Sequence, residues 1–97
     1  MRIIARKTLK IYWQYNPATE QELKAWFAEA NAADWNTPAD VKAKFGNASI
    51  LKDGRVVFNI CGNKHRLVVW MNYTFGVIYI RFIGTHKEYD AIDAQTI

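Results

Sequence analysis

The segment Gly84–Asp90 reads GTHKEYD and places an imidazole, an ammonium and a phenol within four consecutive residues. These groups belong to His86, Lys87 and Tyr89. Imidazoles and phenols can transfer protons, and an ammonium group can neutralise a phosphate. The segment therefore carries groups suited to holding a phosphate and moving a proton.

The same segment has the pattern of a helix start. Thr85 is followed three residues later by Glu88, which is the capping-box spacing. Backbone N–H groups in the first turn of a helix have no partner within the helix, and the helix dipole favours an anion there. Two interpretations are open: a phosphate site at the helix start, or a surface helix that Thr85 and Glu88 merely cap.

Composition narrows the class of protein. The chain has 97 residues, 51% of them hydrophobic and 14% aromatic, so we expect one domain over residues 1–97 with a real core. Its single cysteine, Cys61, excludes an internal disulfide and a cysteine-based zinc site. No stretch has the apolar length of a membrane span or a signal peptide, so we expect a cytoplasmic protein with no membrane partner. The net charge of +4 favours a polyanionic partner, either nucleic acid or an acidic protein segment.

The first half of the chain has helical spacing of apolar residues. Helices are predicted over residues 5–15, from residue 17 to the region 31–36, and from residue 38 to residue 45. Pro17 suits the first position of the second helix, with Asn16 as its cap. Gly46 is a natural stop for the third helix.

The second half has the pattern of strands. Runs rich in β-branched and aromatic residues predict four strands, over residues 49–52, 55–60, 64–73 and 76–83, and residues 1–4 could add a short one. Asp53-Gly54 and Gly62-Asn63 supply tight turns. Helices followed by consecutive strands predict an α+β fold: N-terminal helices packed on a mostly antiparallel four-stranded sheet, with a short C-terminal helix from Thr85.

Strand alternation separates neighbouring polar residues. Lys64 and Arg66 share one face of their strand, whereas His65 lies on the more apolar face with Leu67. We expect His65 to be a partly buried, hydrogen-bonded structural histidine. Arg66 could present a fork of donors to a phosphate, or be a solvated or salt-bridged surface arginine. Asn59, in an otherwise apolar strand, needs a partner and could orient a catalytic group or bond a loop.

Two longer stretches resemble a known family. Residues 57–68 read VFNICGNKHRLV and residues 79–90 read YIRFIGTHKEYD, and together they resemble HigB-type toxins of the RelE-like superfamily. The resemblance implies a compact α+β fold and an mRNA endonuclease that acts on the translating ribosome without a metal or cofactor. It also implies a HigA-like antitoxin partner with a helix-turn-helix domain.

The resemblance also implies a set of site residues. The family pattern places Arg66, His86, Lys87 and Tyr89 in the catalytic site, and we expect these four side chains to converge. Further RNA contacts are expected from Asn59, Asn63, Lys64, His65 and Arg81. The chemistry implied is attack of the ribose 2′-hydroxyl on the adjacent phosphorus, with His86 as the preferred proton-transfer group. Asp90 and Asp93 are interpreted as a solvated face or as contacts to antitoxin or substrate.

Two other functions remain open from the sequence. A non-catalytic RNA-binding module would explain the positive charge and the aromatic residues. A protein-interaction domain that binds an acidic helix would explain the charge alone.

Overall fold

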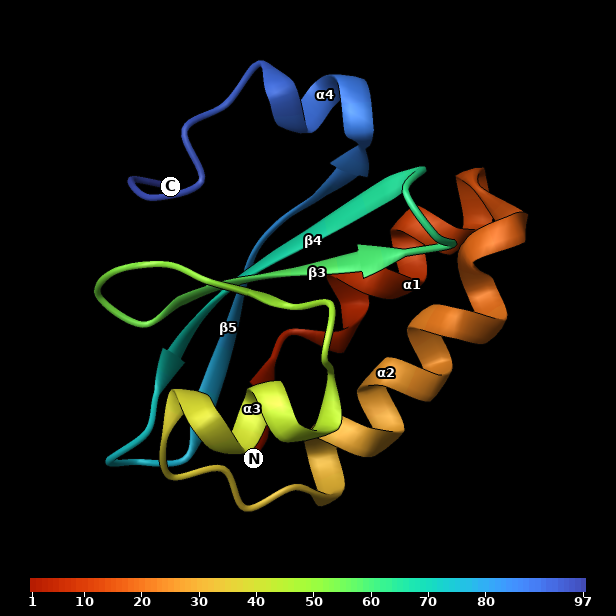
Figure 1. Ribbon diagram of the computed structural model, residues 1–97. Helices are drawn as coiled ribbons and strands as arrows, with labels where there is room; N and C mark the ends of the chain where they lie inside the picture. The colour runs from red at the N-terminus through yellow and green to blue at the C-terminus, as the bar shows by residue number, and fades with distance from the viewer.

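The computed structural model describes residues 1–97. Its helices are α1 (Arg6–Tyr15), α2 (Glu20–Ala32), α3 (Pro38–Lys44) and α4 (His86–Asp90), with a 3₁₀ turn, η1, at Pro17–Thr19. Its strands are β1 (Arg2–Ile4), β2 (Ser49–Ile50), β3 (Arg55–Ile60), β4 (His65–Asn72) and β5 (Val77–Thr85). No helix is both long and apolar enough to cross a membrane. The predicted α+β order of helices, strands and a closing helix is therefore confirmed (Figure 1).

The three N-terminal helices each bury apolar side chains in the main core. These are Leu9 and Trp13 of α1, Leu23, Trp26 and Ala30 of α2, and Val41 of α3. Thr37 and Asp40 cap α3 reciprocally, as a capping box. The expected cap of the second helix is wrong: Pro17 begins η1, and the Asn16 side chain donates backwards to the Tyr12 carbonyl over 3.1 Å. The longer helix begins only at Glu20.

The sheet has five strands in the order β1-β5-β4-β3-β2, one more than the four predicted. The additional strand is the N-terminal segment Arg2–Ile4, which pairs in parallel with Val77–Tyr79 of β5. All the other strand pairs are antiparallel. Residues 49–52 contribute only the two-residue strand β2, because the chain turns towards Asp53 immediately afterwards.

The two faces of the sheet carry different layers. Leu67, Val69 and Met71 of β4 pack under α1–α3 in the main core. Val68 faces the other way and packs with Val57, Ala94 and the C-terminal segment in a smaller cluster. Figure 1 shows α4 and the C-terminus on the side of the sheet away from α1–α3. The alternation predicted for residues 64–71 is confirmed.

A β-bulge in the middle of β5 changes which face of the sheet the following side chains occupy. Val68 pairs with Phe82 and Val69 pairs with Ile80, so Arg81 is the extra residue with no partner in β4. A bulge re-aims side chains on its strand. It lets Ile80 and Ile83 both pack against the main core while Phe82 packs in the smaller cluster.

We expect Leu67→Ala to lower the free energy of unfolding by about 2–5 kcal/mol, because it leaves a cavity between the sheet and the helices. Leu67 is fully buried, whereas Ile11 on α1 is 46% exposed. Ile11→Ala is therefore the matched control, with an expected change within about 0.5 kcal/mol. Urea denaturation measures both values. Equal losses for the two variants would contradict this assignment of the core.

Candidate functional site

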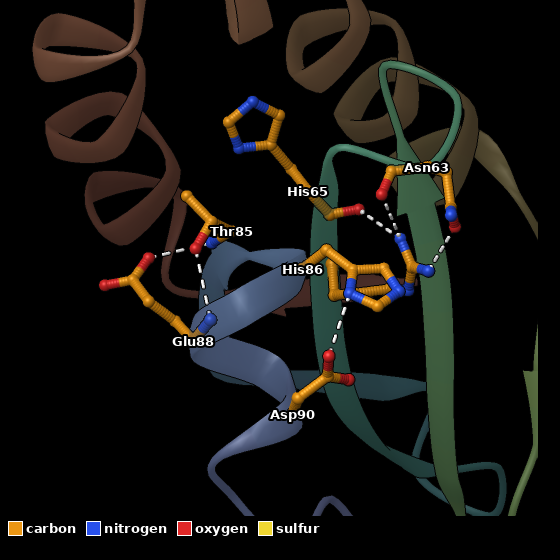
Figure 2. Close-up of polar contacts among 7 residues, drawn as sticks. Asn63, His65, Thr85, His86, Glu88 and Asp90 are labelled. Carbon is orange, nitrogen blue, oxygen red and sulfur yellow. Dashed lines mark hydrogen bonds and ion pairs between the residues drawn. The ribbon is translucent and has the colours of Figure 1, made fainter.

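The start of α4 is fixed by a capping box and by a bond to the neighbouring turn. The Thr85 hydroxyl accepts a hydrogen bond from the Glu88 N–H over 3.1 Å, and the Glu88 carboxylate accepts one from the Thr85 N–H over 2.8 Å (Figure 2). These bonds to Thr85 hold the pKa of the Glu88 carboxyl below its ordinary value. The His86 N–H donates to the Lys64 carbonyl over 2.9 Å. This last bond holds the helix against the turn between β3 and β4.

The capping bonds correct one expectation about this helix start. Its first-turn amides were expected to point outward unpaired, yet the N–H groups of His86 and Glu88 both have acceptors. The Glu88 carboxylate also lies at this end of the helix. The side chains around α4 are therefore better placed than its backbone to hold an anion.

Arg66 lies on the face of β4 that looks towards α4. Its guanidinium donates to the Asn63 carbonyl over 3.1 Å, to the His65 carbonyl over 3.2 Å and to the Asn63 side-chain oxygen. The side chain is only 8% exposed and forms no ion pair. The interpretation as a solvated or salt-bridged surface arginine is therefore wrong. A guanidinium has five N–H donors, so two have no acceptor within the chain.

The ring of Tyr89, a residue of α4, contacts the guanidinium of Arg66. The charged carbon of Arg66 lies 5.8 Å from the centre of the Tyr89 ring, within range of a cation–π contact. Tyr89 also packs against the small cluster of Val57 and Val68 on this face of the sheet. Tyr89 therefore connects α4 to β4, the strand that carries Arg66.

His86 is held by a carboxylate one turn further along α4. Its Nδ1 lies 3.0 Å from the Asp90 carboxylate, and both side chains are partly exposed (Figure 2). A carboxylate at Nδ1 fixes a proton on that nitrogen, which leaves Nε2 free to exchange a proton with a ligand. This is the arrangement of a positioned acid–base group with its orienting partner.

The contact of Asp90 with His86 was not predicted from the sequence. Its signal was available, because side chains four residues apart lie on one face of a helix and His86 and Asp90 have that spacing. Asn63 was predicted only as an RNA contact, and its hydrogen bonds to Arg66 were missed because they depend on the conformation of the turn. Cys61 and Gly62 in this turn both have positive φ, at 53° and 67°.

Most of the predicted site residues lie on β3, β4, the turn between these strands and the adjoining α4. Arg66 pairs with Asn59 on one side and Gly84 on the other, which puts Asn59 beside it in the sheet. The Asn59 side chain was expected to need a hydrogen-bond partner because its strand is otherwise apolar. It is exposed, so it does not need one from the protein. Lys64 is tied to the start of α4 through its carbonyl, and Lys87 is the second residue of the helix; both side chains are exposed. Lys87 is one residue on from His86, so it projects about 100° around the helix from the His86–Asp90 face.

Two predicted RNA contacts lie apart from this group. His65 is on the opposite face of β4, where its Nδ1 lies 2.7 Å from the Tyr12 hydroxyl of α1. Figure 2 shows its ring turned away from Asn63, His86 and Asp90. Arg81 is the exposed bulge residue of β5, and no contact joins it to the site.

The Tyr12–His65 pair confirms the expected structural character of His65. The rings also meet edge to face, with centres 5.6 Å apart. Burial, assisted by Lys64, lowers the pKa of His65, and Glu88 and Glu22 oppose this more weakly. Burial, assisted by Glu88 and Cys61, raises the pKa of Tyr12. Both shifts favour a neutral hydrogen-bonded pair between α1 and the sheet.

We expect the protein to lose stability as the pH falls from about 6.5 towards the lower pKa of folded His65. In that window the unfolded chain binds a proton that the folded chain excludes, so the free energy of unfolding rises with pH. The NMR titration of the His65 Cε1–H should have its midpoint below about 6.5. His65→Gln should remove this component of the pH dependence measured by urea denaturation. A His65 midpoint above that value would contradict the assignment.

Comparison with known proteins shows the family of this chain. Residues 19–92 match the family model of HigB toxins, described as the RelE-like toxic component of a toxin–antitoxin system. The chain is 33% identical over 96 residues to the mRNA interferase toxin HigB of Escherichia coli K12, covering 97% of this chain and 92% of that protein. The mRNA interferases HigB of Escherichia coli O157:H7 and of Shigella flexneri match with the same identity and coverage. The α+β architecture and the matched segment, which includes Arg66, His86 and Tyr89, agree that this chain belongs to the HigB family of RelE-like toxins.

Proposed function

We propose that this protein is an mRNA interferase, an endoribonuclease that cleaves messenger RNA and so inhibits translation. The single observation that carries the proposal is the cluster of Arg66, Tyr89 and the His86–Asp90 pair at one end of the sheet. The relatives named mRNA interferase support the same activity. We place its action in the cytoplasm, on message bound to the translating ribosome.

The reaction is a transesterification within the RNA. The ribose 2′-oxygen attacks the adjacent phosphorus, the bond to the 5′-oxygen breaks, and the products are a 2′,3′-cyclic phosphate and a 5′-hydroxyl end. The nucleophile belongs to the substrate, so the protein needs no nucleophile of its own. It must accept one proton, donate another and stabilise negative charge on the phosphorus.

His86 is the proton-transfer group in this proposal. With Asp90 at Nδ1, the free Nε2 accepts the proton of the 2′-hydroxyl. Asp90 is a positioning residue, because it acts on the substrate only through the imidazole. Tyr89 and Lys87 are the candidates to protonate the leaving 5′-oxygen, since both are on the same short helix.

Arg66 and Lys87 supply the positive charge for the phosphate. The guanidinium keeps two N–H donors after its bonds to Asn63 and His65, and it has no carboxylate to neutralise it. The two carboxylates of α4 are engaged, Glu88 with Thr85 and Asp90 with His86. Lys64, Asn63 and Asn59 border Arg66 and extend a binding surface along the RNA. His65 and Arg81 have no direct place in it.

The family implies a partner that restrains this activity. We propose a HigA-like antitoxin with a helix-turn-helix domain that binds the protein and keeps the basic site from RNA.

His86→Gln should reduce the rate of RNA cleavage by about 10²–10⁴-fold, because it removes the proton-transfer group and leaves the cationic groups in place. Primer extension on message incubated with translating ribosomes measures the new 5′ ends. Fluorescence polarisation with the same RNA should give a Kd close to that of the wild type, and thermal melting should show an intact fold. Binding of RNA by the wild type without any new 5′ ends would support the non-catalytic alternative instead.

Asp90→Asn should lower kcat with little effect on KM, and by less than His86→Gln, because it disturbs the orientation of the imidazole only. Asp90→Glu should restore part of the rate, since a carboxylate is again present near Nδ1. Asp93→Asn is the matched control. Asp93 is an exposed residue of the C-terminal segment, and its carboxylate accepts a hydrogen bond from the backbone N–H of Gln95. An effect on KM alone, or an equal effect in the control, would contradict the positioning role.

A further inference from the structure

One edge of the sheet ends early and leaves part of β3 without a neighbouring strand. β2 pairs only with Val56 and Val57, so residues 58–60 have no partner on that side. Unpaired strand edges are sites where another chain can add a strand.

The free hydrogen-bonding groups on this edge belong to Asn59. The Gly54 carbonyl accepts from Met71 on the β4 side, whereas the Arg55 carbonyl accepts from Leu51 on the β2 side. Backbone groups of alternate residues in an antiparallel strand point to the same side. Asn59, four residues after Arg55, therefore directs its N–H and C=O to the open edge.

The next outward-pointing group already has a substitute partner. The Cys61 N–H donates over 2.7 Å to the carboxylate of Glu22, a residue of α2. The carboxylate takes the place that a carbonyl of a further strand would occupy. The open edge is therefore limited to Asn59 and its immediate neighbours.

A cavity of about 360 Å³ lies beside this edge. It is bordered by α2, by the segment of residues 44–48 and by residues 58–60 of β3. Phe58 forms edge-to-face contacts with both Trp26 and Phe45, at ring-centre distances of 5.4 and 5.2 Å. All three aromatic residues line the cavity, so it suits an apolar side chain. The indole N–H of Trp26, which borders the cavity, is buried without an acceptor within the chain.

The charges around the cavity favour a polypeptide over RNA. Glu22 and Glu29 border it with one cation, Lys44, which pairs with Glu29 over 3.1 Å. The cavity rim therefore has a net charge of about −1 in a chain whose net charge is +4. A polyanion is repelled here, and a neutral or basic segment is favoured.

We propose that the open edge of β3 and its cavity bind an extended, neutral or basic segment of the antitoxin as an added strand, an inference that rests on the proposed toxin function. The residue that pairs with Asn59 would place its side chain on the face of Arg66. Its two neighbours would point to the other face, where an apolar side chain enters the cavity. Binding at this edge would thus bring the antitoxin alongside Asn59 and the RNA-binding face.

Amide hydrogen exchange on the His86→Gln protein, free and in complex with the antitoxin encoded beside its gene, tests the proposal. We expect the Asn59 amide to exchange at least tenfold more slowly in the complex. The amides of Phe58 and Ile60 point to β4 and should be protected in both states, so they are the internal control. An Asn59 amide that stays unprotected in a saturated complex would overturn the proposal. Protection by RNA alone that equals the protection in the complex would assign the edge to RNA, and protection that rises with the concentration of free protein would assign it to a second copy of the chain; either result would also overturn the proposal.

A matched pair of substitutions on α2 gives a second measurement. Ala25 lines the cavity and Ala28 does not, although both are exposed on this helix. Ala25→Arg should weaken antitoxin binding at least tenfold in calorimetry, whereas Ala28→Arg should leave the Kd unchanged. Equal Kd values would contradict the proposal. Cleavage by the free Ala25→Arg protein should equal that of the wild type, so a failure of the docking surface is distinguishable from a failure of the nuclease function.

Discussion

The buried guanidinium of Arg66 is the constraint on which the rest of the site depends. Burial of a charge is costly unless hydrogen bonds and counter-charges compensate it. Here the compensation comes from carbonyl and amide oxygens of Asn63 and His65 and from the ring of Tyr89. No carboxylate of the chain pairs with it. The result is a fixed positive group whose natural partner is an anion from outside the chain.

The same contacts give the site its shape. The turn before β4 is held by Arg66, and the carbonyl of Lys64 in that turn accepts the first amide of α4. Tyr89 and His86 then lie on a helix that cannot shift without breaking these bonds. Groups fixed before the substrate arrives stabilise developing charge without reorganisation, which is the main source of electrostatic catalysis.

The local features of this arrangement could be predicted from the sequence, whereas its long-range contacts could not. The capping box of Thr85 and Glu88 and the alternation of His65 and Arg66 follow from short-range rules, and both occur as predicted. The parallel pairing of β1 with β5 joins residues about 75 positions apart and has no local signal. The bulge at Arg81 and the bonds of Arg66 to Asn63 depend on conformations that side-chain patterns do not encode. The i, i+4 spacing of His86 and Asp90 allowed their contact to be predicted, and the structure places the two groups 3.0 Å apart.

The chemical identity of the RNA ends distinguishes transesterification from other routes of cleavage. In the proposed reaction the 2′-hydroxyl at the cleavage site is the nucleophile. Mass spectrometry of the products should therefore find a 2′,3′-cyclic phosphate, or the monophosphate formed when it opens, and a 5′-hydroxyl. A substrate with a single 2′-deoxyribose at the cleavage site should not be cut there. Products with a 5′-phosphate, or cleavage of the deoxy-substituted substrate at that position, would contradict the proposed transesterification.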